Sequence, residues 1–278
     1  MFATEKLIKM ALEEDLGSGD VTTLSTVPPG TVSRALIKAK QDCVASGLQV
    51  LGLVFRTLDP SLKIESRVAD GDRLQSGDAL MAVTGNVISI LMAERVALNF
   101  VQRLCGVATL TARYVAAVEE FKAEIVDTRK TTPGWRSLEK YAVQVGGARN
   151  HRHGLFDGIL IKDNHIRAAG TVTDAVSHAL AMAPHGLKIE VEAADLNEVK
   201  ETARAGADII LLDNMSEELL REAVSFVRDE YPAIKLEASG GIVLENVARV
   251  AACGVDFISV GALTHSAPAI DISLDLVS

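Results

Sequence analysis

Apolar and polar positions follow two different rhythms along the 278-residue chain. Residues 5–14 carry apolar side chains at helical spacing and predict a helix. Short β-rich runs follow at residues 33–46, 63–68 and 79–83, separated by turn residues such as Asp70-Gly71-Asp72. Two longer helical patterns then occupy about residues 87–104 and 108–121. We interpret residues 1–107 as a small N-terminal α+β domain.

The second rhythm alternates short β-rich runs with helical patterns. The runs are residues 124–126, 158–161, 188–191, 208–212, 234–238 and 256–260. Helical patterns separate the later runs, at residues 195–205, 216–230 and 244–252. Strands that alternate with helices predict parallel pairing through βαβ crossovers. Six strands are too few for a complete eight-stranded barrel, and the pattern fits an incomplete barrel or a doubly wound sheet equally well.

Reactive or charged residues follow nearly every predicted strand of this second region. They include Thr128-Arg129-Lys130, Lys162-Asp163-Asn164-His165, Glu192, Asp213-Asn214, Ser239-Gly240-Gly241 and Gly261. The carboxyl ends of parallel strands meet at one edge, where the loops surround a common crevice. This placement favours an enzyme over a purely structural protein.

Composition narrows the class of protein further. The net charge of -9 argues against a general nucleic-acid binder, because phosphate backbones select for basic surfaces. The first sixteen residues do not resemble a signal peptide, and no apolar stretch reaches the roughly 18 residues that would span a bilayer. Cys43, Cys105 and Cys253 are widely spaced, so we expect buried, reduced thiols and, by elimination, a cytoplasmic protein.

A local excess of positive charge stands out in this acidic chain. Residues 129–167 contain eight Lys and Arg against three Asp and Glu, a local balance of 8 - 3 = +5. Such a concentration attracts a small polyanion, and arginine is suited to holding carboxylates or phosphates. We assign this role to Arg129, Arg152 and Lys162, with His151 beside them. Three other cations of the segment are expected to be solvated on or beside helices: Arg136, Lys140 and Arg167.

Two glycine-containing turns predict a phosphate site. Ser239-Gly240-Gly241 lies between a predicted strand and the start of a helix, where glycine permits close approach and free N–H groups attract anions. Gly261 follows the next strand. Phosphate sites in α/β barrels commonly use the last two strand loops, so the pair is more informative than either turn alone.

Two carboxylates are expected to face the same crevice. Glu192 and Asp213 end neighbouring predicted strands and could contribute to a Mg²⁺ site, bind ribose hydroxyls or stabilise a cationic sugar carbon. Glu190 has the same strand parity as Glu192, so the pattern does not distinguish the two.

These residues belong to long motifs by which the chain resembles the quinolinate phosphoribosyltransferases, the carboxylating nicotinate-nucleotide pyrophosphorylases of NAD synthesis. The motifs include Ala93-Glu94-Arg95-Val96-Ala97-Leu98-Asn99, Asp127-Thr128-Arg129-Lys130-Thr131-Thr132-Pro133-Gly134, Asn150-His151-Arg152, Leu160-Ile161-Lys162-Asp163-Asn164-His165, Leu211-Leu212-Asp213-Asn214 and Leu236-Glu237-Ala238-Ser239-Gly240-Gly241-Ile242. The resemblance implies an open α+β sandwich over residues 1–107, rejoined by the tail at 266–278. It also implies an incomplete α/β barrel over 108–265 and a homodimer, with higher oligomers left open.

The resemblance also assigns roles to individual positions. Quinolinate would be bound by Arg129, His151, Arg152 and Lys162, with Arg95 supplied by the neighbouring subunit. Thr128 would belong to the substrate site. Lys130 and Lys162 would approach phosphoribosyl pyrophosphate and its leaving group, and Glu192 and Asp213 would bind the ribose or the Mg²⁺ environment. The 5-phosphate would be held by Ser239, Gly240, Gly241 and Gly261.

Three alternatives remain at this point. A related phosphoribosyltransferase acting on another pyridine, such as nicotinate, needs fewer cations than a dicarboxylate does. A non-catalytic phosphate-binding barrel would explain the glycine turns but not Glu192, Asp213 or the lysines. An isomerase or lyase of ordinary barrel type would need one acid–base pair and no group of arginines.

Overall fold

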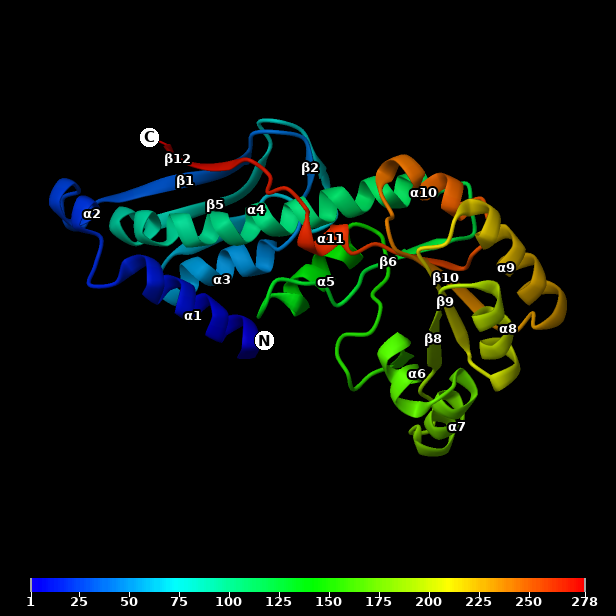
Figure 1. The fold of residues 1–278 in the computed structure, drawn as a ribbon. Helices are drawn as coiled ribbons and strands as arrows, with labels where there is room; N and C mark the ends of the chain where they lie inside the picture. Colours follow the sequence, from blue (N-terminus) through cyan, green and yellow to red (C-terminus); the bar gives the residue numbers. More distant parts are fainter. Residues whose placement is uncertain (1, 278) are drawn as a thin grey trace. The chain divides into compact units, whose positions relative to one another are not determined.

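The computed structural model describes residues 2–277 and divides into two compact units (Figure 1). The first unit comprises Met1–Ala112, Thr132–Gly147 and Ser266–Ser278, and the second comprises Arg113–Thr131 and Ala148–His265. Residues 132–147 therefore group with the first unit, although the sequence placed them in a continuous second domain at 108–265. Side-chain contacts within the first unit explain this grouping, because Trp135 stacks on Phe100 with ring centroids 4.5 Å apart.

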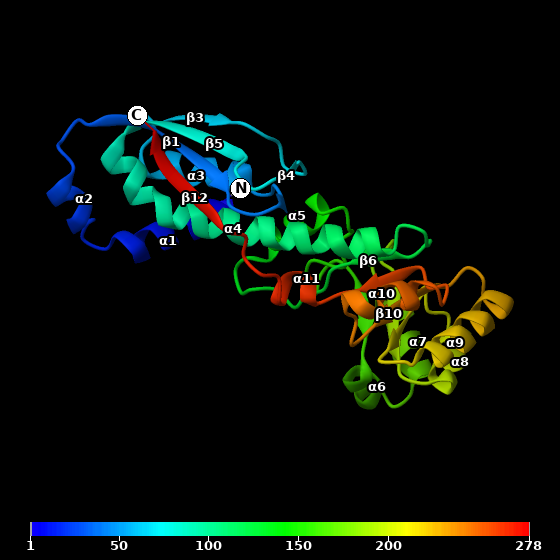
Figure 2. The ribbon, with the colours of Figure 1, turned by 90° about the horizontal axis from the view of Figure 1, so that it is seen from above.

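An antiparallel sheet forms the framework of the first unit. Its strands run in the order β12-β1-β5-β3. Their bounds are β1 (Val32–Ala39), β3 (Lys63–Ser66), β5 (Ala79–Asn86) and β12 (Ile272–Val277), and β2 (Cys43–Val44) pairs separately with β4 (Arg73–Leu74). Alternate residues of β1 are buried, as expected for a sheet with one face against a core. Strand β12 runs along β1 in register from Ala39↔Ile272 to Arg34↔Val277 (Figures 1 and 2).

The helices of the first unit include one that the sequence pattern divided incorrectly. They are α1 (Phe2–Leu16), α2 (Val21–Thr26), α3 (Leu48–Leu58), α4 (Val87–Ala117, which continues into the second unit) and α5 (Arg136–Val145). The two helices predicted at 87–104 and 108–121 are a single helix, α4. Gly106 lies between the two predicted helices and permits close packing: a Cβ there would lie 2.0 Å from the carbonyl oxygen of Pro268.

A buried ion pair links α4 to α5 within the first unit. Glu139 is fully buried and accepts hydrogen bonds from Arg103 Nη2 at 2.8 Å and from the Thr132 amide at 2.9 Å. Arg103 also donates to the carbonyl of Ala267 at 2.8 Å. The next residue, Lys140, is also fully buried, so its expected role as a solvated cation was wrong. Removing one partner of a buried pair costs about 3–5 kcal/mol, which makes this network a strong constraint on the unit.

The second unit contains a six-stranded sheet in the order β6-β11-β10-β9-β8-β7, in which every pair is parallel. The strands are β6 (Glu124–Val126), β7 (Ile159–Ile161), β8 (Ile189–Ala193), β9 (Ile209–Asp213), β10 (Lys235–Ser239) and β11 (Phe257–Ser259). The helices are α6 (Asp163–Ala169), α7 (Val172–Met182), α8 (Leu196–Ala205), α9 (Glu217–Glu230), α10 (Leu244–Ala251) and α11 (Ala262–His265). No pairing between β6 and β7 closes the sheet among the described strands. The expected fold class, an incomplete α/β barrel with an N-terminal α+β domain, is confirmed.

Local sequence explains where several of these helices begin and end. The Asp195 side chain accepts from the amides of Asn197 and Glu198 at the start of α8, and Gly206 ends that helix with a φ of 90°. Ser216 caps α9 by accepting from the Leu219 amide.

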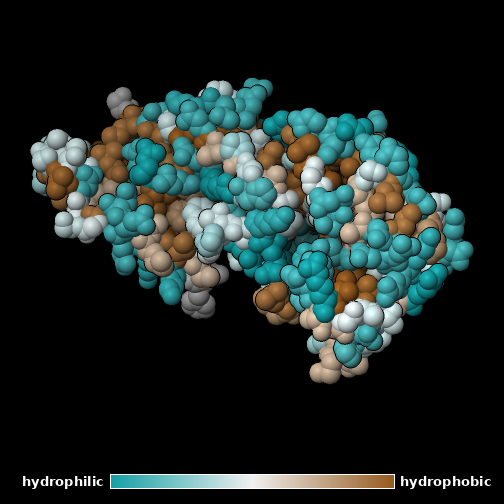
Figure 3. All heavy atoms as spheres, viewed as in Figure 1, coloured by the Kyte–Doolittle hydropathy of each residue, from teal (hydrophilic) through white to brown (hydrophobic). Residues whose placement is uncertain are grey.

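The visible face of this unit is mostly hydrophilic (Figure 3). Within residues 2–277, no helix combines the length and hydropathy needed to cross a bilayer.

Candidate active site

A cavity of 600 Å³ opens at the carboxyl ends of the parallel strands of the second unit. Eleven of the thirteen predicted site residues line it: Thr128, Arg129, Lys130, His151, Arg152, Lys162, Glu192, Asp213, Ser239, Gly240 and Gly241. The other two, Arg95 and Gly261, are not among the lining residues. Side chains that are far apart along the chain are thus brought to one hollow, as the strand-end pattern predicted.

Positive charge is concentrated in the cavity. Arg129 and Arg152 are both half-buried. Burial, followed by the nearby charge of Arg129, lowers the pKa of Arg152. Arg152 donates from Nη1 to the carbonyl of Gly158 at 3.1 Å, which directs its side chain. The charge of Arg129 thus acts on Arg152, and an anion with two carboxylates would offset the repulsion between the two guanidinium groups.

Buried acids lie beneath these cations. Glu190 Oε2 lies 2.9 Å from His151 Nε2, and Glu237 Oε2 lies 3.7 Å from the same nitrogen. Desolvation, followed by the neighbouring charge of Glu190, raises the pKa of Glu237 to about 8. Sequence reasoning named Glu237 only as part of the motif at residues 236–242. Its burial comes from the sheet and could not be inferred from spacing alone.

Strand parity also could not separate Glu190 from Glu192, but the structure does. The Glu190 side chain is directed to His151, whereas Glu192 lines the cavity with its Oε2 atom 2.5 Å from Lys162 Nζ. The Lys162 side chain is 46% exposed, which leaves part of the ammonium group accessible from the cavity. Glu192 is therefore the member of the pair that can approach a bound ligand.

The expected metal position has two carboxylates, but they do not form a preformed coordination site. Asp213 lines the cavity and accepts from Asn214 Nδ2 at 2.9 Å, while Glu192 is paired with Lys162. Among residues 2–277, the group of three potential metal ligands that comes together is instead His151, Glu190 and Glu237. Glu192 and Asp213 could therefore supply one or two ligands to a Mg²⁺ ion whose other ligands are water molecules and substrate phosphate oxygens.

The turn after β10 has the geometry required of an anion cradle. Gly240 has a φ of +90°, and a Cβ there would lie 2.2 Å from Oδ1 of Asn214. Gly241 has a φ of +62°, with nothing within 4 Å of the Cβ position. Both residues therefore require glycine for their backbone conformation, and Gly240 also requires it for space. Asn214 has a φ of 54°, and its backbone N–H donates to the carbonyl of Ser239 at 2.9 Å. Sequence reasoning missed it as a site residue, although it directly follows Asp213.

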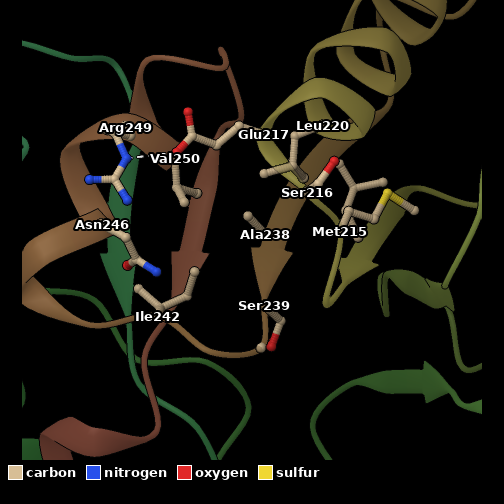
Figure 4. A pocket seen from close by; sticks show the side chains of 12 residues that line it. Met215, Ser216, Glu217, Leu220, Ala238, Ser239, Ile242, Asn246, Arg249 and Val250 are labelled. Carbon is tan, nitrogen blue, oxygen red and sulfur yellow. Dashed lines mark hydrogen bonds and ion pairs between the residues drawn. The ribbon is translucent and has the colours of Figure 1, made fainter.

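A smaller cavity of 190 Å³ lies against the other side of this turn (Figure 4). Apolar side chains including Leu220, Ala238 and Ile242 line it, and an ion pair between Arg249 Nε and Glu217 Oε1 spans 2.7 Å at its edge. The residues that line this cavity come from the ends of β9 and β10, the start of α9, and α10.

Gly261 lies beside the main cavity and allows close approach of Lys130. A Cβ at Gly261 would lie 3.1 Å from Cδ of Lys130 and 3.1 Å from Nε2 of His265. The Thr264 hydroxyl donates to the carbonyl of Lys130 at 2.8 Å and fixes the backbone that carries this lysine. Arg95, by contrast, is exposed on α4 in the first unit.

Comparisons with known proteins cover almost the whole chain. Residues 20–105 match the family profile for the quinolinate phosphoribosyl transferase N-terminal domain, and residues 107–275 match that for the C-terminal domain. The chain is 45% identical over 277 residues to a nicotinate-nucleotide pyrophosphorylase [carboxylating] of Mycobacterium leprae, covering 99% of this chain and 97% of the relative. It is 42% identical over 268 residues to a probable enzyme of the same description from Synechocystis, covering 96% and 90%.

A solved structure shows the same similarity in three dimensions. The nicotinate-nucleotide pyrophosphorylase from Francisella tularensis superimposes with a TM-score of 0.94 at 38% identity, covering 99% of this chain and 96% of that one.

Proposed function

The chain belongs to the quinolinate phosphoribosyltransferase family, and from that premise we propose that it converts quinolinate and phosphoribosyl pyrophosphate into nicotinate mononucleotide, pyrophosphate and CO₂. This reaction is a step of de novo NAD biosynthesis. We place the reaction in the 600 Å³ cavity of the second unit and the enzyme in the cytoplasm.

The observation that carries this proposal is the meeting of a cationic group with a glycine turn in one cavity. Arg129, Arg152 and Lys162 provide positive charge for the two carboxylates of quinolinate. The turn from Ser239 to Gly241 provides space and backbone N–H groups for the 5-phosphate. A dianionic base and a polyanionic sugar can thus be held together despite their repulsion.

The family resemblance supplies the remaining roles. His151 belongs to the quinolinate subsite and Thr128 to the wall of the cavity. Lys130 approaches the pyrophosphate. Gly261 contributes its backbone to the 5-phosphate site and leaves room for Lys130 beside it. Holding both reactants in one orientation converts a bimolecular encounter into a positioned one.

The reaction begins when the lone pair of the quinolinate ring nitrogen forms a bond to the anomeric carbon of the sugar. The bond from that carbon to the pyrophosphate oxygen breaks, and its electron pair leaves with pyrophosphate. Lys130 and Lys162 stabilise the negative charge of the leaving group. Glu192 and Asp213 stabilise the positive character of the sugar carbon or hold its hydroxyls, by analogy with glycosyl transfer.

Decarboxylation follows from the charge that the new bond creates. The ring nitrogen is now quaternary, so the ring can accept the electron pair that remains when the adjacent carboxylate leaves as CO₂. A proton then replaces the carboxylate on the ring carbon. Arg129 and Arg152 keep the second carboxylate in place through both steps.

We propose Mg²⁺ as the cofactor, with Glu192 and Asp213 contributing directly or through water. The donor set fits, because Mg²⁺ accepts one or two protein carboxylates and completes its coordination with water and phosphate oxygens. When bound, the ion would neutralise charge on the pyrophosphate. Glu192 would then exchange part of its contact with Lys162 for the metal environment.

We also propose a homodimer in which Arg95 completes the quinolinate site of the neighbouring subunit. The exposure of Arg95 on α4, where a neighbouring subunit could reach it, supports this assignment. Mixing Arg95→Ala and Arg152→Ala tests it, at a quinolinate concentration at which neither variant alone has detectable activity. If the sites are shared, random exchange of subunits restores about one quarter of wild-type activity, because one site of each mixed dimer is intact. If Arg95 acts only within its own chain, the mixture stays inactive.

The function itself is tested by incubating the pure protein with quinolinate, phosphoribosyl pyrophosphate and Mg²⁺. The expected products are CO₂ and nicotinate mononucleotide in equal amounts. Nicotinate in place of quinolinate is the control, since it can give the mononucleotide without CO₂. Conversion of nicotinate in preference to quinolinate would contradict the assignment of the substrate.

A further inference from the structure

Both ring nitrogens of His151 are engaged by the protein. Its Nδ1 atom accepts from the backbone amide of Arg152 at 2.7 Å, and its Nε2 atom lies 2.9 Å from Oε2 of Glu190. An acceptor at Nδ1 carries no proton, so the ring must carry its proton on Nε2 and donate it to Glu190. A histidine in this arrangement has no ring N–H directed to a substrate carboxylate.

A second hydrogen bond, made by the backbone amide of His151, holds the chain next to this ring. The amide of His151 donates to Oδ1 of Asp127 at 2.8 Å, and Asp127 is fully buried at the end of β6. Two consecutive backbone amides, those of His151 and Arg152, are therefore held by a buried carboxylate and by the imidazole ring. Because Arg152 also donates to the carbonyl of Gly158, both ends of this residue are restrained.

Resting on the proposed function, we propose that Glu190 and His151 are positioning residues for the quinolinate subsite. Glu190 orients the imidazole, the imidazole holds the backbone of Arg152, and Arg152 makes the contact with the substrate carboxylate. The role of His151 is thereby refined from a substrate ligand to a support of Arg152. Second-layer partners of this kind commonly determine how well a contacting group is aligned.

The geometry explains why this support must be a buried carboxylate. Arg129 and Arg152 repel each other at the cavity wall, and Glu190 is a negative group that lies near enough to Arg152 to affect its pKa. Glu237 lies farther from the imidazole, at 3.7 Å, and its raised pKa shows that the second carboxyl favours the protonated form. The expected order of importance is therefore Glu190 before Glu237.

The test is steady-state kinetics of Glu190→Gln, Glu237→Gln and Glu124→Gln, each with the Michaelis constants of both substrates. Glu190→Gln should raise the KM of quinolinate by about tenfold, as expected when a hydrogen bond to a charged partner is weakened, with a smaller change for phosphoribosyl pyrophosphate. Glu237→Gln should raise it less. Glu124→Gln is the matched control, because Glu124 lies on β6 of the same sheet and pairs with Arg149 outside the cavity.

Two substitutions of His151 separate support from direct binding. Asparagine places an amide oxygen near the position of Nδ1 and can still accept from the Arg152 amide, whereas alanine cannot. His151→Asn should therefore retain a lower KM for quinolinate than His151→Ala. Equal KM values for the two variants, at equal thermal stability, would overturn the positioning role.

Nuclear magnetic resonance of ¹⁵N-histidine-labelled wild-type protein provides a readout independent of turnover. With quinolinate bound, the His151 ring should show an unprotonated Nδ1 and a protonated Nε2, the His151→Asn spectrum serving for assignment. A ring protonated on both nitrogens in the complex would refute the proposal. So would a stoichiometric divalent metal lost on Glu237→Gln substitution, because the three side chains would then be ligands.

These experiments distinguish the two levels of inference. If wild-type protein does not convert quinolinate and phosphoribosyl pyrophosphate, the proposed function fails. If the wild type is active and Glu190→Gln has the same quinolinate KM as Glu124→Gln, only the positioning role fails.

Discussion

Substitution of Gly240 by alanine tests whether the turn after β10 is the phosphate site. The new Cβ would lie 2.2 Å from Oδ1 of Asn214 and would be carried by a residue with a φ of +90°. The left-handed conformation costs a non-glycine residue about 1–2 kcal/mol. Asn214 must also move, which breaks its hydrogen bond to Asp213 and costs about 1 kcal/mol more.

Gly206 offers a matched control for the backbone contribution. It has the same φ of +90°, but a Cβ there meets only Leu180 Cδ1, at an ordinary 4.0 Å. Gly206→Ala should therefore lose about 1–2 kcal/mol of stability with little change in kinetics. Gly240→Ala should lose more stability and should also raise the KM of phosphoribosyl pyrophosphate, by about tenfold if about 1.4 kcal/mol of binding is lost.

The assay is a pair of measurements on each variant. Thermal unfolding gives the stability loss, for which 1 kcal/mol corresponds to about 2–4 °C in a chain of this size. Initial rates give the KM of phosphoribosyl pyrophosphate at saturating quinolinate. If Gly240→Ala binds the sugar phosphate as tightly as Gly206→Ala does, the 5-phosphate does not sit on this turn.

Three further expectations address the cations, the buried acids and the long helix. Arg152→Ala should raise the KM of quinolinate by roughly ten- to a hundredfold and that of phosphoribosyl pyrophosphate far less, since an arginine–carboxylate pair is lost; equal weakening of both would contradict the assignment. The pKa of Glu237 is raised from 4.5 to about 8, so between these values the native state keeps a proton that the unfolded chain releases. The free energy of unfolding should accordingly fall as pH rises through this window, and urea titrations should show a weaker fall for Glu237→Gln. Gly106→Ala should destabilise the protein by several kcal/mol without altering the KM of either substrate at a temperature where it is folded, because its Cβ would meet backbone atoms of Pro268.

Sequence reasoning succeeded where a local pattern has one structural solution. The run at 124–126 became β6 without change, and the polar residues at the strand ends met in one cavity because parallel strands share an orientation. It did less well where tertiary packing reverses a local signal. Gly106 marks a close contact inside α4 and not the gap between two helices. Lys140 is buried, although a lysine on a predicted helix was expected to be exposed to solvent.

The contacts among the buried residues of the site could also not be predicted from the sequence pattern. Spacing gave Glu190 and Glu192 the same face, and only their partners, His151 and Lys162, distinguish them. Asn214 lies within a quoted motif, yet its left-handed backbone and its contact with the cradle depend on the neighbouring strand. These features depend on contacts between different strands and helices, so the sequence of one segment does not determine them.

The pairing of β12 with β1 has a consequence for how the protein is made. On the ribosome, β1 emerges early, but its partner strand is translated only after the entire parallel sheet has been synthesised. Until then one edge of the N-terminal sheet has exposed backbone groups that can pair with another chain. A nascent chain would therefore be vulnerable to aggregation during this interval, and fusions that delay or obstruct the final strand should lower the yield of folded protein.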